Sequence, residues 1–237
     1  MRVLVTRPEP ASARTAAELK RRGHEPVLLP LMQAIHQPQA LVTPALPATA
    51  AIAVTSAEAI RVLQTLSQEA RQALLALPLF AVGRATARAA SDAGFADVSV
   101  ADGDGRSLAS LLVATHDAAT PILYLTGSPR SPDFETDLQQ AGRTIDVREC
   151  YRMVPATPDD LDVIETLTPM PEAILVYSAE TARRIGELHH ATRDQLDWQQ
   201  VRFLCLSEKI ARALPAEIQP NSQWSMEPRE DQLLLLL

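Results

Sequence analysis

Short apolar runs alternate with longer segments that are only partly apolar along almost the whole chain. The runs are rich in Val, Ile, Leu and Ala, and a polar or small residue ends each of them, as is typical of β-strands. The segments between them, such as residues 12–22 and 84–93, carry apolar residues at helical spacing. This alternation predicts an α/β fold with parallel sheets covered on both faces. The predicted strands lie near residues 2–6, 26–32, 51–55, 79–83, 97–101, 121–125, 144–151, 173–177 and 202–206.

Two parts of the chain repeat each other. Residues 54–59 (VTSAEA) resemble residues 176–181 (VYSAET), and each stretch leads into a predicted helix. Residues 82–89 (VGRATARA) correspond in the same way to residues 206–213 (LSEKIARA). The second copy then stops before the strand–helix–strand segment that ends the first copy. The N-terminal segment supplies a counterpart to that missing piece.

This arrangement predicts a discontinuous domain organisation. Residues 1–35 and 156–237 together form one domain, and residues 38–150 form a second domain inserted into it. Residues 36–37 and 151–155 are then two connector strands that run side by side between the domains. The predicted fold class is therefore α/β, with two similar parallel-sheet domains joined by a two-stranded connector.

Composition limits the classes of partner. The net charge of −7 argues against a nucleic-acid-binding surface. No apolar run approaches the roughly 20 residues that span a bilayer, so we expect no membrane partner. The apolar start of the chain meets Arg7 and Pro8 too early for a signal peptide, and we expect a cytoplasmic protein.

The cysteine and histidine residues do not form a metal-binding pattern. Cys150 and Cys205 lie in separate apolar runs, and we expect both to be buried free thiols. The chain has only two lysines among 22 basic residues. The excess of arginine suits bidentate binding of carboxylate or phosphate, but it also fits a general preference of the genome.

Small polar residues follow six of the predicted strands, each before a helix. Such residues act either as N-caps of these helices or, with free backbone N–H groups, as cradles for anions. With two domains, two such rims would face one cleft. The candidate binding residues are Thr6, Arg7, Thr55, Ser56, Ala57, Gly83, Arg84, Thr86, Thr126, Gly127, Ser128, Ser178, Ala179, Ser207 and Lys209.

Common catalytic motifs are not present in the sequence. There is no GxGxxG, GxxxxGK[ST] or GxSxG pattern. Ser56 and Ser178 lie at strand ends, but no histidine has a convincing partner position. Asp102 and Asp104 lie in a turn-forming stretch and are expected to be solvated.

The order and spacing of several short segments resemble the uroporphyrinogen-III synthase family, in its bacterial branch. The segments are residues 4–8 (LVTRP), 55–59 (TSAEA), 81–87 (AVGRATA), 125–127 (LTG) and 150–152 (CYR). One segment departs from the family. Many members have a Gly-Pro-Thr-Thr-like turn where this chain has Ser207-Glu208-Lys209-Ile210.

The resemblance implies two flavodoxin-like domains with a flexible interdomain angle and no cofactor. It implies a lyase that converts hydroxymethylbilane to a cyclic tetrapyrrole with loss of water and inversion of the last ring. Tyr151, at a predicted strand end, is the candidate proton donor for the leaving hydroxyl, although it could simply pack there. We expect a monomer, with transient contact to the preceding pathway enzyme.

Two other functions remain open from the residues alone. The first is a non-catalytic, two-lobed protein that binds a small anion. The second is a transferase or lyase that acts on a phosphorylated substrate through the same strand ends.

Overall fold

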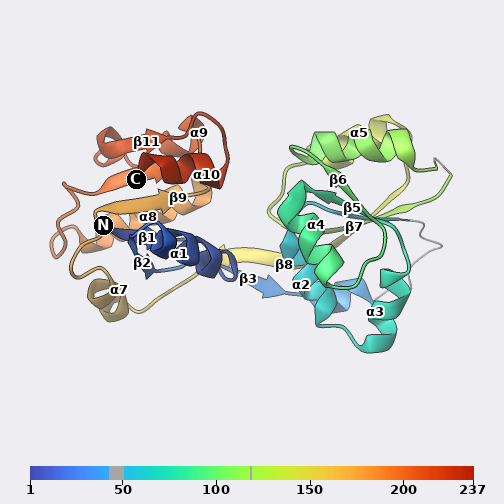
Figure 1. Cartoon of the computed structure of the whole chain (residues 1–237), viewed down its shortest axis with the longest axis horizontal. Helices are drawn as coiled ribbons and strands as arrows, with labels where there is room; N and C mark the ends of the chain where they lie inside the picture. The colour runs from blue at the N-terminus through green and yellow to red at the C-terminus, as the bar shows by residue number, and fades with distance from the viewer. Residues whose placement is uncertain (43–50, 118) are drawn as a thin grey trace. The chain divides into compact units, whose positions relative to one another are not determined.

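The chain folds into two compact units. The computed structural model describes residues 1–42, 51–117 and 119–237. Unit 1 comprises Met1–Gln33 and Val154–Leu237, and unit 2 comprises Ala34–Met153. The chain passes from one unit to the other within two strands, β3 (Met32–His36) and β8 (Ile145–Pro155) (Figure 1).

Unit 1 contains a five-stranded sheet in the order β11-β10-β9-β1-β2, with every pair parallel. Its strands are β1 (Arg2–Val5), β2 (Glu25–Leu28), β9 (Ala173–Val176), β10 (Arg202–Cys205) and β11 (Ser222–Trp224). Its helices are α1 (Ala11–Arg21), α7 (Asp160–Thr166), α8 (Ala179–Thr192), α9 (Glu208–Ala211) and α10 (Glu230–Leu233), with 3-10 turns η2 (Gln219–Asn221) and η3 (Leu234–Leu236).

Both faces of this sheet are buried. Leu4 packs into one apolar cluster with Phe203, whereas its neighbours Val3 and Val5 pack into a second cluster with Leu204. Successive side chains of a strand point to opposite faces, so a run that is apolar throughout requires cover on both. The run of leucines at the C-terminus enters the second cluster through Leu233 and Leu234.

Unit 2 contains a six-stranded sheet in the order β3-β8-β7-β4-β5-β6. Its remaining strands are β4 (Ala51–Val54), β5 (Leu79–Val82), β6 (Val98–Ala101) and β7 (Ile122–Ser128), and all pairs from β8 to β6 are parallel. Its helices are α2 (Ala57–Gln64), α3 (Gln68–Leu75), α4 (Gly83–Asp92), α5 (Gly105–Thr115) and α6 (Asp133–Gln140), with the 3-10 turn η1 (Pro38–Leu41).

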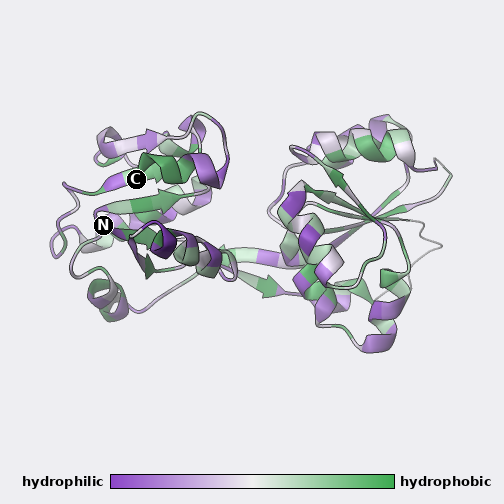
Figure 2. Ribbon diagram, in the orientation of Figure 1, coloured by the Kyte–Doolittle hydropathy of each residue, from purple (hydrophilic) through white to green (hydrophobic). Residues whose placement is uncertain are grey.

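The strands of both sheets are largely hydrophobic, whereas the helices have hydrophobic and hydrophilic sides (Figure 2). In unit 2, Ile52 and Val54 pack in one cluster and Ala51 and Ala53 in another, on the opposite face. No helix in the described part of the chain is long and apolar enough to cross a membrane.

The two sheets share one strand order, the flavodoxin-like order 2-1-3-4-5. In unit 1 the strands taken as first to fifth are β1, β2, β9, β10 and β11. In unit 2 they are β7, β8, β4, β5 and β6, so the same sheet is built from a circularly permuted sequence. The predicted α/β class with two similar parallel sheets is confirmed.

The structure differs from the predicted strands at several points. The predicted strand 26–32 is two strands, β2 and β3, because the chain changes direction around Pro30, which has no N–H for a ladder. The short strand β11 was not predicted, because its three residues form no apolar run.

Two strands continue beyond their predicted ends. Thr126, Gly127 and Ser128 belong to β7 and do not form a turn after it. Tyr151 lies inside β8 and does not end it, because β3 pairs beside β8 and prolongs the sheet.

Candidate active site

The strand order reverses at one place in each sheet. The reversal lies between β1 and β9 in unit 1 and between β7 and β4 in unit 2. In open parallel sheets, ligands bind beyond the carboxyl ends of the strands at such a switch point. The predicted residues Thr6 and Arg7 follow β1, and Thr55 and Ser56 follow β4, so each group lies at a switch point.

A β-bulge places Tyr151 at the switch point of unit 2. Thr126 of β7 pairs with Glu149, whereas the next residue, Gly127, pairs with Tyr151, so Cys150 is the extra residue of β8. Bulges re-aim side chains and are common beside active sites. The Tyr151 ring lies directly against Gly127, where even a Cβ atom would overlap it.

The environment of Tyr151 favours the protonated phenol. Its side chain is buried, and burial raises its pKa, while a hydrogen-bonding interaction with the Ser56 side chain partly opposes the rise. Ser56 is also the N-cap of α2, where its hydroxyl accepts a hydrogen bond from the Glu58 N–H at 3.2 Å. The neighbouring Thr55 hydroxyl lies 3.2 Å from the Tyr124 hydroxyl. Ser56 and Tyr151 thus interact at the carboxyl end of the sheet, and the half-buried Thr55 lies next to Ser56.

Glu58, which the sequence analysis did not select, adds a buried carboxylate to these residues. Its Oε1 atom lies 2.6 Å from His36 Nε2, and its other oxygen pairs with Arg61. Burial opposes ionisation of Glu58, but the hydrogen bonds and charges of Arg61 and His36 outweigh it and hold the pKa of Glu58 below its usual value. The repeat of Ser-Ala-Glu was a signal for Glu58, but no sequence feature linked it to His36.

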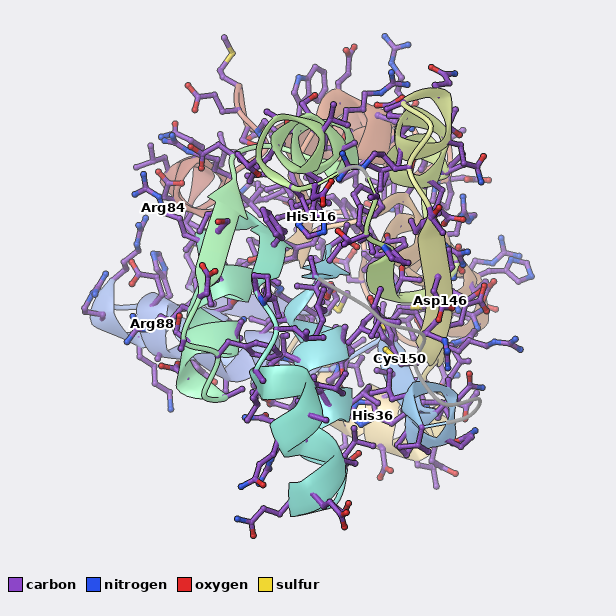
Figure 3. All side chains as sticks on the ribbon, turned by 90° about the vertical axis from the view of Figure 1, so that its right-hand side faces the viewer. His36, Arg84, Arg88, His116, Asp146 and Cys150 are labelled. Carbon is purple, nitrogen blue, oxygen red and sulfur yellow. The ribbon has the colours of Figure 1, made fainter. Side chains whose placement is uncertain are left out.

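The start of α4 forms a second part of the unit 2 rim. Gly83 adopts a φ of 72°, a left-handed conformation that favours glycine, and lets the helix begin directly after β5. No side chain of the described residues caps this helix. Thr86 is buried in its first turn, whereas Arg84 is exposed. His36 and Cys150 lie on the neighbouring strands β3 and β8, and Arg84 is well separated from both in Figure 3.

The switch point of unit 1 holds an interaction network that sequence reasoning missed. Arg7 donates a hydrogen bond to Glu230 Oε1 at 2.9 Å, and its guanidinium lies 4.2 Å from the centre of the Tyr177 ring. The Tyr177 hydroxyl and the Thr15 hydroxyl donate to the same oxygen. Burial raises the pKa of Tyr177, and the nearby Glu230 raises it further. Arg7 is therefore already paired with an internal carboxylate.

The other predicted residues of unit 1 have local roles in the fold. Thr6 is fully buried and its hydroxyl donates to the Leu175 carbonyl at 2.8 Å. Ser178 caps α8 by accepting a hydrogen bond from the Thr181 N–H at 3.0 Å, and Ala179 begins that helix. Ser207 precedes the short helix α9, where Lys209 is exposed.

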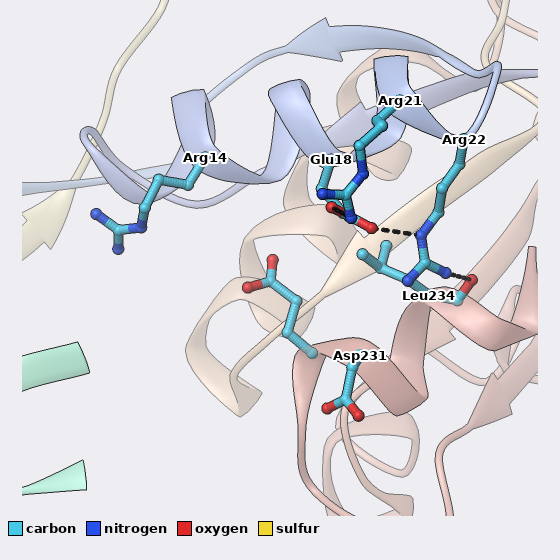
Figure 4. A pocket seen from close by; sticks show the side chains of 7 residues that line it. Arg14, Glu18, Arg21, Arg22, Asp231 and Leu234 are labelled. Carbon is cyan, nitrogen blue, oxygen red and sulfur yellow. Dashed lines mark hydrogen bonds and ion pairs between the residues drawn. The ribbon is translucent and has the colours of Figure 1, made fainter. Parts of the chain in front are cut away.

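A hollow of about 390 Å³ lies between α1 and the C-terminal segment of unit 1 (Figure 4). Its ionisable residues are three arginines and three acids, and Arg22 is held by Glu18 and by the Leu234 carbonyl. The acids balance the basic charge, so this hollow is a poor site for the polyanionic substrate that the family resemblance implies.

The thiols are inert groups of the core. Cys150 and Cys205 are buried and unpaired, as predicted, and burial raises the pKa of each thiol to about 12. Among the residues that the structure describes, no group of three or more His, Cys, Asp or Glu side chains is placed to hold a metal ion.

These observations define a doubly wound α/β protein of two similar units, with a polar site at the switch point of each sheet. A family model described as "Uroporphyrinogen-III synthase HemD" matches residues 13–234, and the chain belongs to that family. Family membership supports a cyclising lyase of haem biosynthesis with hydroxymethylbilane as the small-molecule substrate. A non-catalytic anion-binding protein is not favoured.

Solved structures show the same fold. The chain is similar to uroporphyrinogen-III synthetase from Helicobacter pylori 26695, with a TM-score of 0.66, 16% identity, and coverage of 100% of this chain and 98% of the other. It is also similar to a mutant uroporphyrinogen III synthase from the extremely thermophilic bacterium Thermus thermophilus, with a TM-score of 0.53, 20% identity, and coverage of 99% and 96%. No curated protein matches the sequence significantly.

Proposed function

We propose that Tyr151 is the general acid that protonates the departing hydroxyl of hydroxymethylbilane. The observation that carries this assignment is the position of the phenol at the switch point of unit 2, where the bulge of β8 aims it over Gly127. A phenol whose pKa is raised by burial stays protonated at neutral pH, as a proton donor must.

The reaction gives this proton a defined path. The C–O bond of the terminal hydroxymethyl group breaks, the hydroxyl takes the phenol proton and leaves as water, and the bilane becomes an azafulvene cation. The substituted carbon of the last ring attacks this cation and forms a spiro intermediate, which fragments and closes again with that ring inverted. When the final pyrrole regains aromaticity it loses one proton, and the phenolate takes it back.

The protein contributes mainly orientation and charge stabilisation. Hydroxymethylbilane also closes spontaneously without inversion, so the enzyme must hold the last ring in the inverting geometry and react faster. We assign the carboxylates of the substrate to the strand-end groups of both units, above all the backbone N–H groups at the start of α2, α4 and α8. Backbone donors explain how a chain with a net charge of −7 binds a polyanion.

The same chemistry bears on how the substrate reaches the enzyme. We infer a monomeric, cytoplasmic enzyme that receives its substrate by transient contact with the preceding pathway enzyme. The support for direct transfer is the spontaneous closure of free hydroxymethylbilane, which wastes substrate during diffusion.

The activity is tested with freshly generated hydroxymethylbilane and no added metal or nucleotide. The products are oxidised and the porphyrin isomers are separated. The expected product is mainly the type III isomer, because the enzyme inverts the last ring before closure. Formation of the type I isomer alone, as in buffer, would contradict the function.

A further inference from the structure

The two copies of the Ser-Ala-Glu segment differ in the surroundings of their glutamate. Both serines cap a helix, and both glutamates pair with an arginine three residues later, Glu58 with Arg61 and Glu180 with Arg183. The Glu180 side chain remains 41% exposed, whereas that of Glu58 is 9% exposed. Of the two, only Glu58 has a second side-chain partner among the described residues, His36, whose Nε2 lies 2.6 Å from its carboxylate.

Burial of Glu58 is not needed for its role in the helix. A buried carboxylate loses its hydration and is tolerated only when hydrogen bonds and charges replace it. Glu180 occupies the same position in the first turn of α8 and makes the same type of arginine pair from an exposed position. We therefore looked for another role of the buried Glu58 at its second partner, His36, in the strand β3.

His36 stands opposite Tyr151. The Ala156 N–H donates to the Leu31 carbonyl at 3.0 Å and the Gln37 N–H to the Cys150 carbonyl at 2.8 Å. The residue numbers fall in β8 as they rise in β3, so the two strands are antiparallel, and this register places His36 across from Tyr151. Directly opposed side chains stand on the same face of the sheet.

Glu58 joins the two elements that hold the phenol. It lies in α2, whose N-cap Ser56 interacts with Tyr151, and it bonds His36 in the strand next to β8. We propose that Glu58 and His36 form a clamp that positions the Tyr151 hydroxyl for proton transfer to the substrate. This inference rests on the proposed role of Tyr151 as the acid. Glu58 and His36 are positioning residues, since they act through Tyr151.

The clamp predicts a specific pattern of kinetic change. Without the Glu58 carboxylate, α2 and β3 are no longer tied, so the phenol points at the leaving hydroxyl for a smaller fraction of the time. Proton transfer slows while binding of the substrate carboxylates is unchanged, and more substrate closes spontaneously to the type I isomer.

The main experiment compares Glu58→Gln with the control variant Glu187→Gln in the full-length enzyme. Glu187 also pairs with an arginine three positions away, Arg184, but it lies beyond the first turn of α8. We expect Glu58→Gln to lower the kcat for type III formation about tenfold, with KM changed less than about twofold, and to raise the type I fraction. Glu187→Gln should keep the kcat and the isomer ratio within about twofold of the unchanged enzyme, because its exposed pair with Arg184 is weak. Equal behaviour of the two variants would overturn the clamp.

A double-mutant cycle separates the clamp from the role of Tyr151. If Glu58 acts through the phenol, Glu58→Gln should change the kcat less than about twofold in a Tyr151→Phe background, a non-additivity typical of coupled residues. The same tenfold loss in both backgrounds would overturn the clamp and leave the acid role of Tyr151 intact. A Tyr151→Phe enzyme with unchanged rate and isomer ratio would overturn both.

A second variant tests the clamp in case Glu58→Gln does not fold. His36 is partly exposed, so His36→Gln should fold even if Glu58→Gln does not, and thermal melting checks both proteins. His36→Gln should lower the kcat about threefold to tenfold without a change in KM. In the Tyr151→Phe background, it should not lower the kcat further. A folded His36→Gln enzyme with normal kcat and isomer ratio would overturn the clamp.

Discussion

Residue 127 has to be glycine because of its neighbour and not because of its own backbone. Gly127 is not among the glycines with positive φ, unlike Gly83 or Gly142. The Tyr151 ring occupies the volume that any side chain at residue 127 would need. At the scale of single residues, the candidate active site is thus a pair in which one residue provides the hydroxyl and the other provides the space for its ring.

Gly127→Ala should therefore displace the Tyr151 ring. Overpacking of this kind costs about 1–3 kcal/mol of stability, and the type III rate should fall about tenfold or more because the phenol is misplaced. Gly186→Ala is the matched control, since its Cβ would overlap Pro215 in unit 1. It should lower the melting temperature and leave the isomer ratio unchanged. If Gly127→Ala kept the ratio as well, the contact would have no catalytic meaning.

Tyr151→Phe tests the hydroxyl alone. The ring and its contact with Gly127 are retained, so the protein should fold normally. The kcat should drop roughly tenfold to a thousandfold, within the range of a general acid, while product affinity changes little. The reaction should continue, because positioning supplies most of the rate and water still provides protons. The type I fraction should rise. An unchanged rate and isomer ratio would leave Tyr151 with a packing role only.

At the scale of elements, the N-termini of the helices contribute both to stability and to the proposed substrate binding. Ser56 and Ser178 each satisfy one N–H group at the start of a helix, and such capping contributes about 1 kcal/mol. The first helical turn has further N–H groups, and these are the proposed binding groups for substrate carboxylates. Because the donors belong to the backbone, no single side chain should be essential for binding.

Single substitutions in these turns should accordingly have small effects. Ser56→Ala, Thr86→Ala and Ser178→Ala should each lose no more than about 1–2 kcal/mol of transition-state stabilisation, the scale of one neutral hydrogen bond. The measurement is kcat/KM for type III formation, with melting curves to correct for loss of the caps. Complete inactivation of one folded variant would point to a serine or threonine nucleophile instead.

At the scale of the whole molecule, the two units have the same sheet topology, but the strands follow one another along the chain in a circularly permuted order. The strand β1 that opens unit 1 corresponds to β7 near the end of the inserted segment. Each unit has apolar clusters on both faces of its own sheet. A compact unit with its own core is expected to fold independently.

A fragment of residues 38–150 should therefore melt cooperatively on its own. A fragment of residues 1–120 should not, because it lacks β9 and β10 of unit 1 and β7 and β8 of unit 2. Circular dichroism during heating distinguishes the two cases. Cooperative melting of the longer fragment, and not of the shorter one, would exclude the proposed discontinuous domains.

Local patterns in the sequence were sufficient for the fold class. The strand period of two and the helix period of about 3.6 are properties of neighbouring residues, so apolar spacing revealed most strands and their parallel arrangement. The repeat of VTSAEA and VYSAET also pointed to two similar sheets, and the strand order bears this out. Strand ends were less well predicted. The last residues of β7 are in a strand because they pair with β8, and this pairing is not visible in either segment alone.

The chemistry of the site was decided by the tertiary structure. The sequence drew attention to Tyr151 and Ser56, but the bulge that sets the tyrosine over Gly127 depends on the register of two strands. His36 and Glu58 are 22 positions apart, and Arg7 and Glu230 are 223 positions apart. Whether a buried carboxylate stays ionised depends on such distant partners, which no local pattern of residues specifies. Sequence alone therefore determined which elements form, and only their packing determined which charges and hydroxyls meet.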